Sequence, residues 1–168
     1  KQRLERQRQR LRARRVITRQ QQRRQRAGAG TRAVSPAARN IVQKAENAAR
    51  ILVVGDFMAN GLHWGLEQAY AQNPNVVFVD KAHGLSGIVR DDVVNWPEKT
   101  KVFIEEYNPV AVIVLVGMND RQQMRLSTGR VAKLSEEWKA AYNDRVDKIA
   151  KAVRDKNLPL IWLGLPPV

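Results

Sequence analysis

The stretch Ile51-Leu-Val-Val-Gly-Asp-Phe-Met-Ala-Asn-Gly-Leu62 decides the fold of this chain. It begins with consecutive aliphatic residues, and the lack of polar alternation indicates a strand covered on both faces, as in a parallel sheet. The strand ends at Gly55, and apolar residues then recur at helical spacing from Met58 onward. A strand, a glycine turn and a helix place Asp56 and Phe57 at the carboxyl edge of a sheet, where open α/β folds bind ligands.

The same alternation continues along the chain. Aliphatic runs at residues 76–79, 110–116 and 160–163 predict three more buried strands. Helical patterns lie between them, over residues 58–72, from Trp96-Pro97 onward, and from a Ser135 cap to about residue 157. This order predicts an α/β fold with a doubly wound parallel sheet, in three layers as in flavodoxin-like proteins.

The excess positive charge is confined to the N-terminal segment. The net charge is +14, and residues 1–50 hold 16 Lys and Arg against 2 Asp and Glu, whereas residues 51–168 hold 14 of each. We predict a basic arm and linker over residues 1–35, the arm being either helical or disordered. The α/β domain is expected to span residues 36–168 and to open with a short helix from Pro36 to Arg50.

The composition of the arm favours a soluble spacer, although an arginine-rich arm can also bind an anionic partner. Seven arginines are predicted to contact such a surface: Arg8, Arg10, Arg12, Arg14, Arg15, Arg23 and Arg24. A soluble spacer, an anionic membrane surface or acidic protein partner, and nucleic acid are the alternatives. Nucleic acid is the least favoured, because no aromatic residue is present in the arm to stack on a base. No apolar run reaches 18 residues, so we expect no transmembrane segment in this chain.

Polar residues and glycines follow each of the first three predicted strands. The three loops contain Gly55-Asp56-Phe57, residues 80–87 and Gly117-Met-Asn-Asp120. A parallel sheet brings such loops to one rim. Asn119 beside the backbone N–H of Gly87 would suit an oxyanion, since both can donate hydrogen bonds to developing negative charge. The alternative is that these residues only terminate strands.

These blocks resemble the first three sequence blocks of SGNH (GDSL-type) hydrolases, over about residues 50–168. The similarity is to a proteobacterial, envelope-associated subgroup, and it implies a three-layer α/β domain related to esterases of O-acyl groups. It also implies a periplasmic or cell-envelope location, with a cytoplasmic one left open. Gly87 and Asn119 carry over as oxyanion donors. The expected rim of the site consists of Gly55, Asp56, Gly117, Asp120, Arg121 and His83.

Two departures from the family pattern predict impaired hydrolysis. Phe57 occupies the position of the nucleophilic serine, and a phenyl ring has no lone pair with which to attack an acyl carbon. The family's Asp-x-x-His block, which supplies the base, is expected after the fourth predicted strand, where this sequence ends at Val168, and neither His63 nor His83 is a good replacement. Ser86 is a poor substitute nucleophile, because it has no visible base.

We therefore expect a binding or structural component of the envelope, with a small O-acylated or sugar ligand. Two alternatives remain open at this point. One is an active esterase that uses a non-standard nucleophile, and the other is a protein that binds nucleic acid or an anionic surface through its arm.

Charged residues also follow the second and third loops. Arg121 and Arg125 are placed to hold an anionic or sugar ligand, although Arg121 can instead pair with Asp120 or Asp56. Arg90 has the same two possibilities, because acidic residues follow it at positions 91 and 92.

Other chemistry has little support in the sequence. The aromatic residues Trp96 and Trp162 are expected to pack in the core. The chain has no cysteine and two distant histidines, so no metal-ligand cluster is visible. It also lacks a Gly-x-Gly-x-x-Gly turn and a phosphate-binding Gly-Lys-Ser/Thr loop, and we expect no cofactor.

Overall fold

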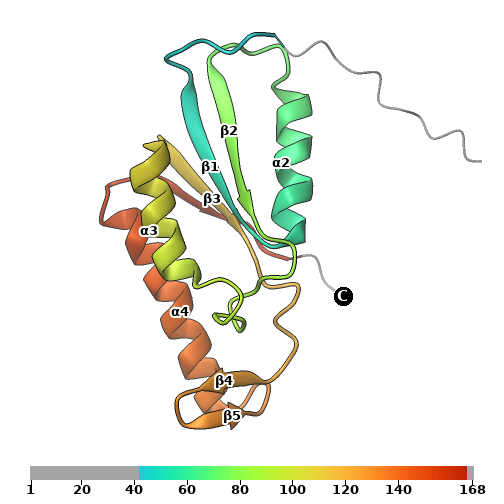
Figure 1. Cartoon of the computed structure of the whole chain (residues 1–168), viewed down its shortest axis with the longest axis vertical. Coiled ribbons are helices and arrows are strands. Elements are labelled where there is room, and N and C mark those ends of the chain that lie inside the picture. Colours follow the sequence, from blue (N-terminus) through green and yellow to red (C-terminus); the bar gives the residue numbers. More distant parts are fainter. Residues whose placement is uncertain (1–41, 166–168) are drawn as a thin grey trace, which may run out of the picture. The chain divides into compact units, whose positions relative to one another are not determined.

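The computed structural model describes residues 42–165, which form an α/β fold with helices on both faces of a parallel β-sheet (Figure 1). The strand order is β2-β1-β3-β6, and every pairing in this sheet is parallel. The strands are β1 (Ala49–Gly55), β2 (Val76–Ala82), β3 (Ala111–Leu115) and β6 (Leu160–Trp162). The predicted fold class is confirmed. The predicted arm with its seven arginines lies outside the described residues.

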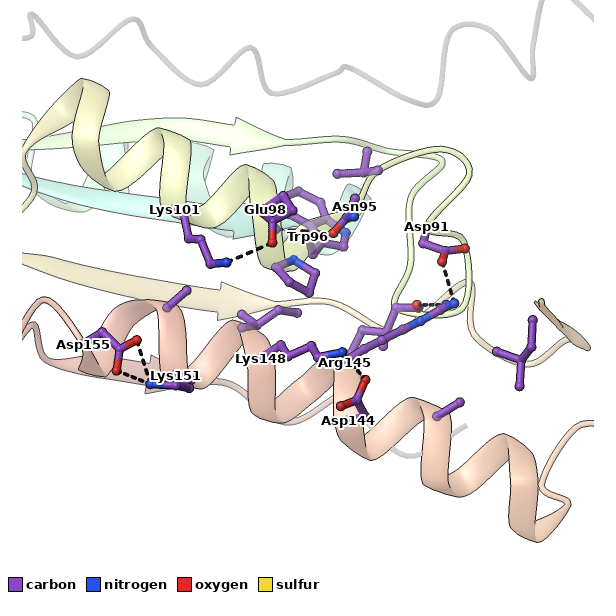
Figure 2. A pocket seen from close by; sticks show the side chains of 17 residues that line it. Asp91, Asn95, Trp96, Glu98, Lys101, Asp144, Arg145, Lys148, Lys151 and Asp155 are labelled. Carbon is purple, nitrogen blue, oxygen red and sulfur yellow. Dashed lines mark hydrogen bonds and ion pairs between the residues drawn. The ribbon is translucent and has the colours of Figure 1, made fainter. Parts of the chain in front are cut away.

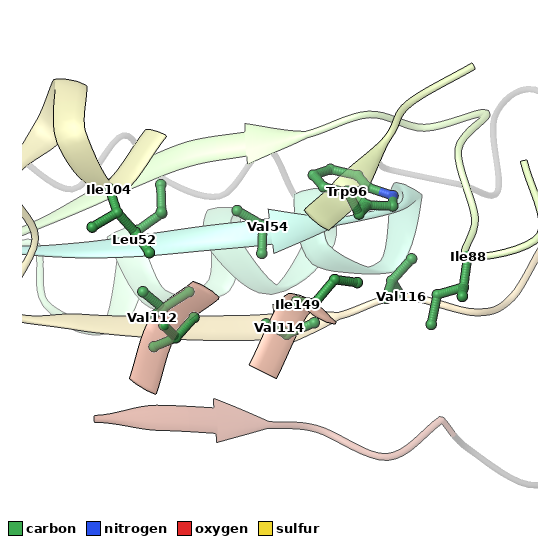
Figure 3. Packing of buried hydrophobic residues seen from close by; sticks show 10 residues of the cluster. Leu52, Val54, Ile88, Trp96, Ile104, Val112, Val114, Val116 and Ile149 are labelled. Carbon is green, nitrogen blue, oxygen red and sulfur yellow. The ribbon is translucent and has the colours of Figure 1, made fainter. Parts of the chain in front are cut away.

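Three helices cover the sheet. Helix α2 (Phe57–Ala69) packs on one face, while α3 (Trp96–Tyr107) and α4 (Glu136–Arg154) pack on the other. Successive residues of a strand point to opposite faces. Accordingly Val53 packs with the α2 layer, whereas Leu52 and Val54 pack with the α3–α4 layer (Figure 3). Both faces are buried, which explains why β1 reads as an unbroken aliphatic run.

The largest buried cluster lies on the α3–α4 side of the sheet. Trp96 is only 3% exposed and belongs to this cluster (Figure 3), and Trp162 packs against the cluster. Their predicted packing role is therefore confirmed. No helix within residues 42–165 combines the length and the apolar character that crossing a membrane would require.

Each helix begins at a side-chain cap. Asp56, Asn95 and Ser135 accept hydrogen bonds from the backbone N–H groups two or three residues further on. Such caps satisfy donors that the first turn of a helix cannot pair internally. The predicted start of the third helix at Ser135 is confirmed.

The predicted helix from Pro36 to Arg50 is wrong over its described part. Residues 42–48 are not helical, and β1 already begins at Ala49. The backbone N–H groups of Val42 and Ala45 donate to the carbonyls of Ala71 and Pro74, at 3.0 and 2.8 Å. The alanine-rich composition favours a helix locally, but pairing with the α2–β2 connection prevails here.

A short hairpin follows the third loop and was missed by the sequence analysis. Strands β4 (Met124–Leu126) and β5 (Gly129–Val131) pair antiparallel, separate from the main sheet. Met124 and Val131 are buried with Trp138 of α4. The turn residues 127–129 between two short runs were the available signal, and Gly129 has a φ of +130° there.

Candidate functional site

The first three loops of the sheet meet at one rim, as the sequence predicts. The carbonyl of Gly55 accepts a hydrogen bond from the backbone N–H of His83 at 2.8 Å, which ties the first loop to the second. A Cβ atom built on Gly87 would lie 3.6 Å from the Cβ of Asn119, so the second loop also touches the third. Residues from three separate strand ends are therefore held within contact of one another.

Asp56 joins the first loop to the third from below the surface. Its side chain is fully buried. One carboxylate oxygen accepts from the N–H of Met58 at 3.0 Å, and the other accepts from the N–H groups of Gly117 and Met118 at 2.9 and 2.8 Å. Gly117 has a φ of +133°, which favours glycine. Asp56 thus acts as a helix cap and as a brace, and it is not exposed at the rim.

Asp120 braces the third loop to the second in the same way. Its carboxylate accepts from the N–H groups of Ile88 and Val89 at 3.0 and 3.1 Å and from the hydroxyl of Tyr142 at 3.1 Å. Burial raises the pKa of Asp120, and these three hydrogen bonds oppose that shift. Burial also raises the pKa of Tyr142, and the negative charge of Asp120 adds to this effect.

The proposed pairing of Arg121 with Asp120 or Asp56 is not found. Both carboxylates are bonded to backbone amides, and Tyr142 is the additional partner of Asp120. Arg121 is exposed and forms no ion pair with any residue from 42 to 165. Arg90, in contrast, binds Asp92 through two guanidinium nitrogens at 2.8 and 2.9 Å.

Replacing Tyr142 by phenylalanine is expected to lower the free energy of unfolding by about 1.5–3 kcal/mol at neutral pH. The ring that stacks on Trp138 is kept, but the hydrogen bond to the ionised Asp120 is lost. Because this bond favours the ionised carboxyl, its loss raises the pKa of Asp120 further. The destabilisation should therefore shrink as the pH falls and Asp120 takes up a proton. Urea unfolding at pH 7 and pH 4 measures both values, and an equal loss at the two pH values would contradict this account.

The side-chain amide of Asn119 holds the second loop in place. Its Nδ2 donates to the carbonyls of Gly84 and Ser86 at 3.1 and 2.6 Å. Two carbonyl acceptors fix the orientation of the amide, because the opposite orientation would place oxygen against oxygen. Both of its hydrogens are thereby occupied. The backbone N–H of Gly87 has no acceptor among residues 42–165, so of the two predicted oxyanion donors it is the one left unoccupied.

Phe57 presents an exposed phenyl ring at the start of α2. Phe57 is the first residue of α2 and is 47% exposed. A Cβ atom on Gly84 would lie 3.9 Å from the Cβ of Phe57, so this side chain stands where the first and second loops meet. The rim at this point offers an apolar surface.

The other candidate nucleophile and bases are not arranged as a catalytic set. Ser86 is fully buried, and its hydroxyl lies 3.5 Å from the carbonyl of Gly55. His83 is exposed in the second loop. His63 lies within α2, and its Nε2 is 3.1 Å from the carbonyl of Phe78 on β2. Among residues 42–165, no group of three or more His, Asp or Glu side chains could hold a metal ion.

Three side chains that support the site, those of Trp138, Gln122 and Tyr142, were missed by the sequence analysis. Trp138 donates from its indole N–H to the carbonyl of Gln122 at 3.0 Å, and Gln122 donates from its amide to the carbonyl of Asn119 at 2.6 Å. Tyr142 stacks on Trp138 with ring centroids 4.7 Å apart. The sequence signal was the four-residue spacing of Trp138 and Tyr142 on one helical face, which indicates packing but not hydrogen bonding to a loop.

Comparison with known proteins gives one family. A search of curated proteins found no match to the chain. Residues 50–168 match the family described as "Protein of unknown function (DUF459)". This segment runs from β1 through all three loops of the candidate site, and it coincides with the region that resembles SGNH hydrolases, which supports an SGNH-hydrolase-like domain. Because the match covers well over half of the sequence, the chain belongs to the DUF459 family.

Proposed function

We propose that this protein contains an SGNH-hydrolase-like domain that binds a ligand at the rim and does not hydrolyse esters through a serine nucleophile. The observation that carries this proposal is Phe57. It is half-exposed at the first position of α2, directly after Asp56, where the resemblance expects serine. Nucleophilic catalysis requires an atom that can share a lone pair with the acyl carbon, and a benzyl side chain has none.

The surrounding hydrogen bonds also support a binding role. Both amide hydrogens of Asn119 are held by carbonyls of the second loop, so stabilising an oxyanion would require this loop to move. Ser86 supports an alternative nucleophile poorly, because it is fully buried beneath the rim. Asp56 and Asp120 are occupied by backbone amides, which leaves neither carboxylate placed as a general base.

The proposal also covers the class of ligand, the cellular location and the partner of the basic arm. The family resemblance favours a small O-acylated or sugar ligand and a place in the periplasm or cell envelope. The arginines within residues 1–26 would then contact an anionic membrane surface or an acidic protein partner. Activity as an esterase with a non-standard nucleophile, and binding of nucleic acid through the arm, are the competing functions.

Ester turnover by the full chain tests the proposal. We expect wild type, Phe57→Ala and Asn119→Ala to hydrolyse p-nitrophenyl acetate at the same rate, within about twofold, because none of them supplies a nucleophile at the rim. Trp64→Ala serves as a control, since Trp64 is an exposed aromatic residue further along the same helix. The proposal would be overturned if wild type and Trp64→Ala both hydrolysed the ester and if the rate of Asn119→Ala were at least tenfold lower.

A further inference from the structure

The cleft beside the β4–β5 hairpin carries an excess of positive charge. It has a volume of about 510 Å³, and three arginines line it together with one acidic residue: Arg90, Arg125, Arg130 and Asp92. Two glutamine side chains complete its polar wall. Three cations against one carboxylate leave two positive charges unbalanced. The volume lies within the range of small-molecule binding sites.

The hairpin places two of these arginines directly opposite each other. Arg125 of β4 and Arg130 of β5 are register partners. Met124 and Val131, the adjacent pair, are buried, so the arginine pair projects from the opposite, exposed face. Directly opposed like charges destabilise an antiparallel pair. The hairpin register therefore places two like charges at directly opposed positions.

The acid in the cleft does not fully offset this repulsion. Asp92 already binds Arg90 at 2.8 and 2.9 Å. The pKa of Asp92 is lowered, chiefly by this hydrogen-bonded arginine, and the charge of Arg125 lowers it further. The side chains of Arg125 and Arg130 form no hydrogen bond or ion pair with any residue in the part of the chain that the structure describes.

The larger cleft of the domain provides a contrast. It lies between α3 and α4, has a volume of about 630 Å³, and is shown in Figure 2. Each cation that lines it has a carboxylate at 2.6–2.9 Å, as in the pairs Lys101–Glu98 and Lys148–Asp144. Unbalanced positive charge is thus a property of the hairpin cleft and does not extend to this larger cleft.

The hairpin cleft is attached to the candidate site by two hydrogen bonds. Val89 lines the cleft and donates to the carboxylate of Asp120, while Gln122 lines it and donates to the carbonyl of Asn119. The hairpin cleft therefore adjoins the second and third loops of the candidate site.

We propose that the hairpin cleft binds a carboxylate or phosphate group of the ligand, with Arg125 and Arg130 as its principal donors. The planar guanidinium fork of arginine matches both kinds of oxyanion through paired hydrogen bonds. A bound oxyanion relieves the repulsion between the two arginines, and the two glutamines can bond neighbouring hydroxyl groups. This inference rests on the proposed function, because it names the chemical class of the ligand for the same rim.

Titration of the full chain with three probes tests this proposal: trigalacturonate, inorganic phosphate and neutral maltotriose. The Arg125→Gln/Arg130→Gln variant is compared with Lys101→Gln/Lys148→Gln, which removes the same charge from the larger cleft. All proteins keep the basic arm, so binding to the arm contributes equally. We expect the hairpin variant to bind at least one anionic probe about 10- to 100-fold more weakly than wild type, while the control variant stays within about twofold of it.

The two anionic probes identify the source of the group. If the hairpin variant loses affinity for trigalacturonate alone, the bound group is a carboxylate. If it loses affinity for phosphate alone, the group is a phosphate ester. If it loses affinity for both, the site recognises the oxyanion that they share. Equal affinity of the hairpin variant and wild type for both anions would overturn the proposal, and so would equal binding of maltotriose and trigalacturonate by wild type. Hydrolysis of p-nitrophenyl acetate is measured separately, so it can overturn the proposed function and leave the anion site intact.

A stability measurement separates a binding role from a structural one. Without ligand and at low salt, Arg130→Gln should raise the melting temperature by about 1–4 °C, because it removes the opposed like charge. Phosphate or trigalacturonate, whichever binds, should raise the melting temperature of wild type more than that of the variant. A lower melting temperature for Arg130→Gln without ligand would show that the arginine supports the fold and would overturn the inference.

Discussion

Replacing Gly55 by alanine is expected to lower the free energy of unfolding by more than about 4 kcal/mol. An added Cβ would lie 1.8 Å from the carbonyl oxygen of Leu115 and 2.6 Å from its carbonyl carbon. These are backbone atoms of the neighbouring strand, which cannot yield as a side chain can. Gly55 also has a φ of +147°, a conformation that L side chains rarely adopt.

Gly65→Ala is the matched control for this substitution. Gly65 lies within α2 with no atom within 4 Å of the added Cβ, so alanine there should raise the free energy of unfolding by about 0.5–1 kcal/mol. Chemical denaturation of wild type and both variants measures the difference. If Gly55→Ala unfolds within 1 kcal/mol of wild type, on the order of an average substitution, the close approach of β1 and β3 at the site is refuted.

Replacing Asp56 by asparagine is expected to lower the free energy of unfolding by about 3 kcal/mol, although the two side chains are nearly equal in size. One carboxylate oxygen accepts from the N–H groups of Gly117 and Met118, and the other accepts from Met58. An amide has a single acceptor oxygen, so its NH₂ group must face a backbone donor on one side. At least one buried N–H then loses its partner, and the tie between the first and third loops weakens.

Asp144→Asn controls for the loss of one negative charge. Asp144 pairs with Lys148 on the exposed face of α4, and such a surface pair contributes little. Its loss should change the free energy of unfolding by less than about 0.5 kcal/mol. The same denaturation measurement applies, and equal effects of Asp56→Asn and Asp144→Asn would show that the buried brace is not what holds the loops together.

The sheet and its helices could be predicted because their signals are local. The unbroken run at residues 51–54 and the cap at Ser135 depend on residues close in sequence. The segment before β1 could not be predicted, because its conformation is set by bonds from Val42 and Ala45 to residues about 29 positions away. The hairpin was also missed, since strands of three residues give too little alternation to read.

The convergence of the three loops could be predicted from the topology, but the task of each side chain could not. Asp56 and Asp120 were expected at the rim, yet both are buried and occupied by backbone amides. Which donors a carboxylate meets depends on loops 31 to 62 residues away, and the sequence pattern does not contain that information. Tyr142 reads as one more apolar position of α4, although its hydroxyl reaches Asp120.

The most direct test of the central proposal, that this rim has no serine nucleophile, is the mass of the intact full chain after incubation with a fluorophosphonate. Such a reagent forms a covalent adduct with an activated serine. We predict no adduct on wild type, because the proposal assigns Phe57 to the nucleophile position and because Ser86 is fully buried. A stoichiometric adduct that maps to Ser86 would contradict the proposal and would establish an active serine hydrolase with a displaced nucleophile.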